Sequence, residues 1–286
     1  MEVRDQLKEA KSKFRASGIS EVDAEHLFAH ILGISRMDLH NSIKVEEACS
    51  EFEDLMDVEE DFLALCQRRE RGEPLQYITG TAYFYNLTLE VGPGVLVPRP
   101  ETELLVESIL QHLKSSRKPT SVIDLGAGSG AIALAIATEE PLARVIAVEN
   151  DGAALVWLRK NCESADVEVR IVAEDVATAL LGVKADLVVA NPPYIPNGQM
   201  LPRDVLDYEP HVALFGGGED GMEIPRKFID AAARLLKPGG LFVMEHGEAQ
   251  TEAVTAKLAE DFVEVKTHAD LNDRPRWSSA LRRAHD

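Results

Sequence analysis

Short apolar segments alternate with helical periodicity through most of this 286-residue chain, from residue 102 to the end. The apolar runs at 121–125, 143–148 and 186–190 are typical of buried strands, and the residues between them have the spacing of helices. Alternation of this kind favours parallel strands joined by helical crossovers. The sequence therefore predicts an open α/β sheet, in which ligands bind beyond the carboxyl ends of the strands.

A glycine-rich turn follows the first of these strands and precedes a helical run at 131–138. Backbone can approach a ligand closely there, because glycine has no side chain. The pattern Gly-x-Gly-x-x-Ala also fits the dinucleotide fingerprint, so the glycines alone indicate a nucleotide-like ligand without saying which one. The residues predicted to hold it are Asp124, Gly126, Ala127, Gly128, Ser129 and Gly130.

Two acidic residues follow the next two strands. Glu149 ends the strand at 143–148, and a carboxylate about twenty residues after a glycine turn would accept hydrogen bonds from ribose hydroxyls. Asp175 follows a strand at 167–172 and is placed to meet an adenine amino group, with Val176 beside it. Each carboxylate could instead cap the helix that follows it. Together with the glycines they predict an adenosine pocket.

The tetrapeptide Asn191-Pro192-Pro193-Tyr194 ends the apolar strand at 186–190. The Asn191 side chain offers a carbonyl, and the prolines have no N–H, so the turn displays acceptors without competing donors. The ring of Tyr194 can cover a planar group. Such a site suits an amide or amino nitrogen as nucleophile, because acceptors fix its orientation and raise its electron density. An ordinary Pro-Pro turn is the alternative interpretation.

The first 71 residues read as helices, with no strand run between them. Residues 46–61 hold nine acidic residues and no basic one, most simply as solvated helix faces, alternatively as a face for a basic partner. Two short strands within 83–91 and a Gly-Pro-Gly turn indicate a hairpin linker. We therefore expect a helical domain at 1–75, a linker at 76–100 and an α/β domain at 101–286.

Composition limits the partners and the compartment. A net charge of −19 repels phosphate backbones, so direct nucleic-acid binding is not expected. The three cysteines form no motif, which suits a reducing cytosol. The amino terminus lacks a signal peptide, and no apolar run approaches the roughly 20 residues of a membrane span. We expect a soluble, cytoplasmic monomer without membrane contact.

Two further clusters are assigned structural roles. His26 and His30 lie four residues apart, but they do not form a His-Glu-x-x-His pattern and no further ligands are evident, so no metal site is predicted. Glu245, His246 and Gly247 stand at the end of a strand at 241–245 and could hold an acid–base pair. A strand-end turn that caps a helix is the interpretation we favour for them.

The chain resembles the class I S-adenosylmethionine-dependent methyltransferases and, within them, the release factor glutamine methyltransferase family. The resemblance covers nearly the whole chain. Asn-Pro-Pro-Tyr is shared with many nitrogen methyltransferases, whereas the two blocks Glu-Pro-Leu-Gln-Tyr-Ile-Thr-Gly at 73–80 and Val-Pro-Arg-Pro-Glu-Thr-Glu at 97–103 are much more restricted. Further matches lie at 124–130, 208–210, 213–217 and 274–277.

The resemblance implies a seven-stranded, mostly parallel Rossmann-like methyltransferase sheet, completed by a final antiparallel pair at about 262–266 and 278–282, with a smaller substrate-recognising helical domain. It implies N5-methylation of the glutamine in the Gly-Gly-Gln motif of peptide chain release factors, from S-adenosylmethionine to S-adenosylhomocysteine, without a metal. Asn191 Oδ1 and the Pro192 carbonyl would accept the amide hydrogens, with Pro193 in the same turn. Tyr194 and Phe84 would pack the flat carboxamide. Val176 stands where some relatives place an aromatic residue against adenine.

Two alternatives from other classes stay open. An adenine-N6 DNA or RNA methyltransferase uses the same tetrapeptide on an exocyclic amine, but it predicts a basic groove and stacking aromatics. The acidity of the chain and an aromatic content of 6% count against it. A non-catalytic adenosine- or dinucleotide-binding module would use the glycine turn alone and leaves residues 191–194 unexplained.

Overall fold

The computed structural model describes residues 3–116 and 118–284, which form two compact units. The first unit comprises Met1–Gly80 together with Pro202–Tyr208. The second comprises Thr81–Leu201 and Glu209–Asp286. The segment predicted as a linker, 76–100, is thus divided at residue 80, and its first residues belong to a short helix rather than to the hairpin.

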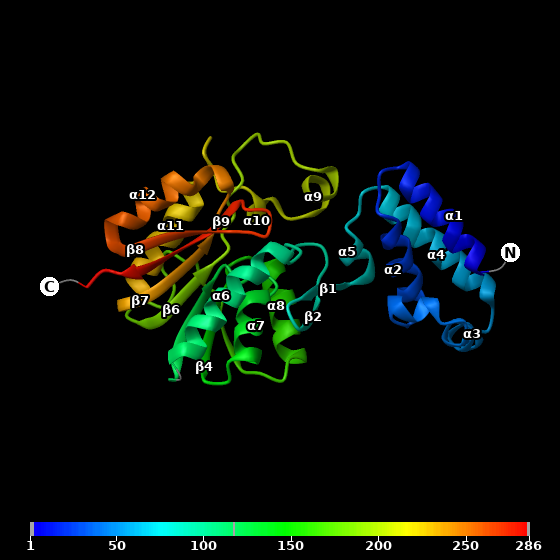
Figure 1. The fold of residues 1–286 in the computed structure, drawn as a ribbon, viewed down its shortest axis with the longest axis horizontal. Helices are drawn as coiled ribbons and strands as arrows, with labels where there is room; N and C mark the ends of the chain where they lie inside the picture. Colours follow the sequence, from blue (N-terminus) through cyan, green and yellow to red (C-terminus); the bar gives the residue numbers. More distant parts are fainter. Residues whose placement is uncertain (1–2, 117, 285–286) are drawn as a thin grey trace. The chain divides into compact units, whose positions relative to one another are not determined.

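The first unit consists of helices, which Figure 1 colours blue to cyan apart from α9. Their bounds are α1 Val3–Ala16, α2 Glu21–Ile31, η1 Arg36–His40, α3 Ser42–Ser50, α4 Leu55–Glu70, α5 Leu75–Thr79 and α9 Arg203–Tyr208. Backbone N–H groups at the starts of α2, η1, α3 and α4 donate to the side chains of Ser20, Ser35, Asn41 and Asp54. The rings of Phe28 and Phe62 meet edge to face in the core, with centroids 5.1 Å apart.

The second unit contains a seven-stranded sheet in the order β5-β4-β3-β6-β7-β9-β8 (Figure 1). The strands are β3 Thr120–Leu125, β4 Ala143–Val148, β5 Val169–Val172, β6 Ala185–Ala190, β7 Leu236–Glu245, β8 Phe262–Ala269 and β9 Pro275–Arg282. β9 runs antiparallel to both of its neighbours, β7 and β8. The predicted mostly parallel sheet is confirmed, and the last two strands are longer than expected. A separate hairpin pairs β1 Thr81–Phe84 with β2 Leu87–Glu90.

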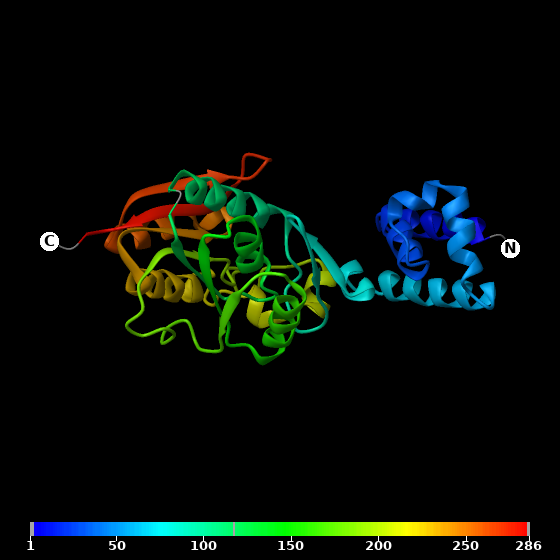
Figure 2. The same cartoon turned by 90° about the horizontal axis from the view of Figure 1, so that it is seen from below.

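Helices cover both faces of the sheet (Figure 2 gives the view at right angles to Figure 1). The helices of this unit are α6 Pro100–Ser116, α7 Ala131–Glu139, α8 Gly152–Ser164, α10 His211–Leu214, α11 Glu223–Leu235, η2 Glu248–Gln250 and α12 Thr251–Asp261. Alternate residues of β3 point to opposite faces. Val122 packs in one core with residues of α6 and α7, and Ile123 packs in a second core with residues of α11 and α12.

The strand order reverses at β3, because β4 lies on one side of it and β6 on the other. Leu125, the last residue of β3, pairs with Ala190, the last residue of β6. The glycine turn and Asn191 therefore leave the sheet side by side, at the point where α/β sheets bind ligands. Across the ranges 3–116 and 118–284, we find no helix with the length and apolarity to span a membrane.

Candidate active site

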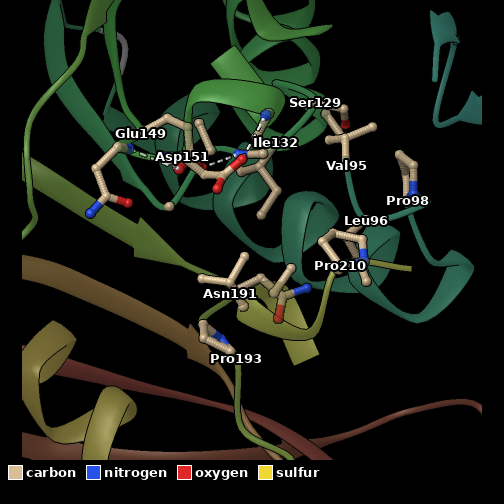
Figure 3. Close-up of a pocket in the computed structure, with 18 of the residues that line it drawn as sticks. Val95, Leu96, Pro98, Ser129, Ile132, Glu149, Asp151, Asn191, Pro193 and Pro210 are labelled. Carbon is tan, nitrogen blue, oxygen red and sulfur yellow. Dashed lines mark hydrogen bonds between the residues drawn. The ribbon is translucent and has the colours of Figure 1, made fainter. Parts of the chain in front are cut away.

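A cavity of about 310 Å³ lies at the carboxyl ends of β3, β4 and β6. Figure 3 shows Asn191 and Pro193 on one side of it and Glu149 and Asp151 on the other. The predicted site residues that line the cavity are Phe84, Gly126, Ala127, Gly128, Ser129, Glu149, Asp175, Val176, Asn191 and Pro193. Four predicted site residues are not among its lining residues: Asp124, Gly130, Pro192 and Tyr194.

The glycine turn is held against β4 and stays open toward the cavity. The N–H groups of Gly126 and Ala127 donate to the carbonyl of Val148 at 2.9 and 3.0 Å. Gly128 has a φ of +56°, and a Cβ there would meet nothing within 4 Å, so backbone conformation rather than crowding favours glycine. Gly130 has a φ of +87°, which is strained for any residue with a side chain, and a Cβ there would also come within 2.7 Å of Cδ1 of Leu158.

Glu149 fixes its carboxylate at the cavity wall with three backbone hydrogen bonds. Oε2 accepts from the N–H of Gly128 at 2.9 Å, and Oε1 accepts from those of Asn150 and Asp151, both at 2.8 Å. Asp151, not Glu149, caps α8, by accepting from the N–H groups of Ala153 and Ala154. Glu149 therefore does not cap α8, and its carboxylate is a preorganised acceptor beside the glycine turn.

Asp175 does not cap a helix, because no helix begins between β5 and β6 among the described residues. Its Oδ1 accepts from the N–H of Ala177 at 2.8 Å within a turn. Its Oδ2 accepts from Nδ2 of Asn150 at 3.4 Å, and the residue also lines the cavity together with Val176.

Asp124 lies beneath the glycine turn with only 1% of its surface exposed. Oδ2 accepts from the N–H of Ala133 at 3.1 Å, whereas Oδ1 has no partner among the described residues. Burial raises the pKa of this carboxyl to about 7, and the charge of Glu149 adds to the shift while the hydrogen bond from Ala133 opposes it. A buried, unpaired acceptor next to the turn fits a ligand that carries a donor or a positive charge.

The turn at Asn191–Tyr194 is held by contacts with the loop before α11 and with η2. Nε2 of Gln250 donates to the carbonyl of Tyr194 at 2.7 Å and to that of Asp220 at 2.8 Å. Gly221 packs so tightly that a Cβ would lie 2.2 Å from the Tyr194 carbonyl oxygen. Pro192 is buried within this packing, while Asn191 and Pro193 face the cavity.

Two families match this chain. Residues 100–205 match the Methyltransferase small domain family, and residues 5–80 match the PrmC N-terminal domain family. A "Release factor glutamine methyltransferase" of Streptomyces coelicolor is 42% identical over 90% of this chain and 89% of its own length. Another with that name, from Mycolicibacterium smegmatis, is 40% identical over 98% of both chains. The chain belongs to the release factor glutamine methyltransferase family.

Solved structures agree on the fold. The T. Thermophilus 16S rRNA methyltransferase RsmC, solved in complex with AdoMet and guanosine, is 25% identical with a TM-score of 0.54, over 71% of this chain and 50% of that one. A methyltransferase from Pyrococcus furiosus is 18% identical with the same TM-score of 0.54, over 70% of this chain and 91% of that one. The second likeness concerns the fold alone.

The turn at Glu245–Gly247 has the predicted helix-capping role, because Gly247 is the N-cap of η2 and its N–H donates to Oε1 of Gln250 at 2.9 Å. Glu245 itself caps no helix and has a role in this methyltransferase family site that the sequence did not predict. Its Oε2 accepts from Oγ1 of Thr102 at 2.6 Å, and its Oε1 accepts from the Tyr194 hydroxyl at 3.2 Å. Burial raises the pKa of the Glu245 carboxyl, and the hydrogen bonds from Thr102 and Tyr194 oppose that shift.

Several residues that line the cavity were not predicted from the sequence. Arg99 and Thr102 line the cavity, and Arg99 pairs with the buried Glu209, which also accepts from the N–H of Val97 at 3.1 Å. Their block at 97–103 and the Tyr-Glu-Pro segment were used only for the resemblance, although a charged residue inside a restricted motif is a signal for a site. Lys227 and Phe228 come from α11 and carry no local motif.

Asp124 gives a pH-dependent prediction. Because its folded pKa of about 7 lies above the ordinary aspartate value of 3.8, the folded protein binds an extra proton between these pH values. The wild type should therefore lose stability relative to Asp124→Asn as the pH rises from about 4 to about 7, by roughly 4 kcal/mol at most, and the difference should be constant above that. The measurement is the free energy of unfolding of both ligand-free proteins at each pH, from urea unfolding and from hydrogen exchange of the β3 amides.

The exposed Asp166 provides a matched control, since Asp166→Asn should show no such trend. A stability difference between wild type and Asp124→Asn that does not vary with pH would contradict the buried, proton-binding carboxyl.

Proposed function

We propose that this protein transfers a methyl group from S-adenosylmethionine to the side-chain nitrogen of the glutamine in the Gly-Gly-Gln motif of peptide chain release factors, and releases S-adenosylhomocysteine. The observation that carries the proposal is the cavity in which the oriented Asn191 amide adjoins the glycine turn of β3. The names of the relatives support the choice of substrate. Release factors act in translation, so we also propose a cytoplasmic place of action.

The donor fits the residues that surround the glycine turn. Gly128 leaves open space for a close approach, Glu149 offers a fixed carboxylate to hydroxyl groups, and Asp175 with Val176 lies at the end expected to meet adenine. The sulfonium of the donor supplies an electrophilic methyl carbon. The protein is left with binding, alignment and exclusion of water, and the proposed reaction needs no metal because the carbon is already activated.

The acceptor amide is held by carbonyl oxygens. Nδ2 of Asn191 donates to Oγ1 of Thr102 at 3.3 Å, and among the described residues no donor reaches Oδ1. Oδ1 and the carbonyl of Pro192 would accept the two hydrogens of the substrate amide, which turns the nitrogen lone pair toward the donor. The buried ring of Phe84 lines the cavity and supplies an apolar wall for the flat carboxamide, with Tyr194 behind the turn.

The helical unit is proposed as a second contact for the release factor. Its segment 46–61 carries nine acidic residues without a basic one, and most of these side chains are exposed. Complementary charge on the factor would steer the encounter rather than take part in the chemistry.

Asn191→Ala should slow turnover far more than it weakens donor binding, because the oriented acceptor acts on the transition state. The expected rise in the barrier is on the order of 2–4 kcal/mol. Asn197→Ala, at an exposed residue just after the turn, is the control and should leave turnover unchanged. Labelled S-adenosylmethionine with release factor, duplex DNA and RNA as acceptors measures both the rate and the substrate class. Unchanged turnover in Asn191→Ala, or preferential labelling of DNA or RNA, would refute the proposal.

Neutralising three exposed acids of the helical unit tests the second contact. The combined variant Glu53→Gln, Glu60→Gln and Asp61→Asn should raise KM for the whole release factor and weaken its salt dependence, while KM for a short Gly-Gly-Gln peptide stays as in the wild type. Neutralising the exposed Asp166 and Glu168 of the second unit is the control. An equal KM for whole factor in all three proteins would exclude this face.

A further inference from the structure

A chain of hydrogen bonds runs from the cavity to a buried carboxylate. Nδ2 of Asn191 donates to Oγ1 of Thr102 at 3.3 Å, and Thr102 donates to Oε2 of Glu245 at 2.6 Å. The Tyr194 hydroxyl donates to the other oxygen of Glu245 at 3.2 Å. Three segments far apart in sequence meet here: the start of α6, the turn after β6 and the last residue of β7.

Counting protons along this chain fixes the orientation of the Asn191 amide. Thr102 has one O–H hydrogen, and it is directed at a carboxylate that, when ionised, only accepts. The Thr102 oxygen is therefore left as an acceptor, and only the NH₂ end of the Asn191 amide can donate to it. The carbonyl end of the amide must then point away from Thr102, which is the orientation in which Oδ1 can accept a hydrogen of the substrate amide.

The opposite orientation would be incompatible with an amide nucleophile. If the Asn191 amide were turned over, its NH₂ group would face the NH₂ group of the substrate, and two donors cannot pair. The tetrapeptide alone does not prevent this, because the two ends of an amide side chain have nearly the same shape. Selection between the two orientations has to come from the neighbour of Asn191, which is Thr102.

Glu245 is a costly residue for structure alone. It is 4% exposed, and no described cation forms an ion pair with it, since the nearby Arg276 pairs with Asp270 at 2.9 Å. A buried carboxylate satisfied by two hydroxyls carries a desolvation penalty that an apolar residue would avoid. The presence of the Glu245 carboxylate is therefore better explained by the direction that it gives to the Thr102 hydroxyl than by a contribution to the stability of the fold.

We propose that Thr102 and Glu245 are positioning residues that set which end of the Asn191 amide meets the nucleophile, an inference that rests on the proposed function. Glu245 accepts the hydrogen of the Thr102 hydroxyl, so the Thr102 oxygen accepts from Nδ2 of Asn191. Asn191 then presents Oδ1 to the substrate amide. Neither residue takes a proton from the substrate. Tyr194 holds the second oxygen of Glu245 and so keeps the carboxylate in place.

The first test compares two substitutions of similar size at one position. Thr102→Val removes the hydroxyl and should lower kcat by on the order of 10²-fold, because the amide is no longer fixed in the productive orientation. KM for the release factor and donor affinity should stay near the wild-type values, whereas the melting temperature should fall, because one oxygen of the buried Glu245 loses its donor. Thr102→Ser keeps the hydroxyl and should retain most of the rate. Equal kcat in Thr102→Val and Thr102→Ser would overturn the proposal.

Glu245→Gln is the independent second variant. Its NH₂ group can donate to Thr102, which then donates to Oδ1 of Asn191 and turns the amide over, so kcat should fall although the side chain keeps its shape. A wild-type kcat in Glu245→Gln would likewise overturn the proposal.

A double-mutant cycle separates positioning from a general structural effect. If Thr102 acts through Asn191, Thr102→Val combined with Asn191→Ala should be no slower than Asn191→Ala alone. Fully additive losses would overturn the proposal. The wild type measured alone reports on the proposed function, because absence of methylation of the release factor refutes that function whatever the variants do.

Discussion

The parallel register between β3 and β6 is the constraint on which the rest of the site depends. It pairs Leu125 with Ala190 at the point where the strand order reverses. The two chemical halves of the site, the glycine turn and the Asn191 turn, therefore start from neighbouring strand ends. A slip of one residue in this pairing would exchange the faces of β6, whose Leu187 and Val189 pack in one core and whose Val188 and Ala190 pack in the other.

Around this constraint the protein keeps Glu209, which pairs with Arg99, and three buried carboxylates without an ion-pair partner among the described residues, at Asp124, Glu149 and Glu245. Each is handled differently: backbone N–H groups satisfy Glu149, two hydroxyls satisfy Glu245, and Asp124 retains an unpaired oxygen and a raised pKa. Uncompensated negative charge disfavours the ligand-free fold and favours a positively charged ligand. In the proposed reaction the donor is positively charged before transfer and neutral afterwards, so the same carboxylates would discriminate substrate from product.

The parts of the fold and site that could be predicted are those encoded in short stretches of sequence. The apolar runs predicted the strands, and the glycine turn, Glu149, Asp175 and Asn191 followed from their positions at strand ends, because parallel strands bring their carboxyl ends to one edge. Thr102 and Glu245 could not be paired from the sequence, since they lie 143 residues apart. Likewise, nothing local indicates that Pro202–Tyr208, in the middle of the α/β region, packs with the helical unit. Such pairings are made by tertiary structure, and the cavity residues from α11 were missed for the same reason.

The most direct test of the account is a crystal structure of the protein with S-adenosylhomocysteine and a glutamine-bearing Gly-Gly-Gln peptide. The account predicts the glutamine nitrogen about 2.7–3.2 Å from both Oδ1 of Asn191 and the carbonyl oxygen of Pro192, facing the sulfur. A glutamine amide bound away from these two oxygens, or a flipped Asn191 whose NH₂ group faces the substrate, would contradict it.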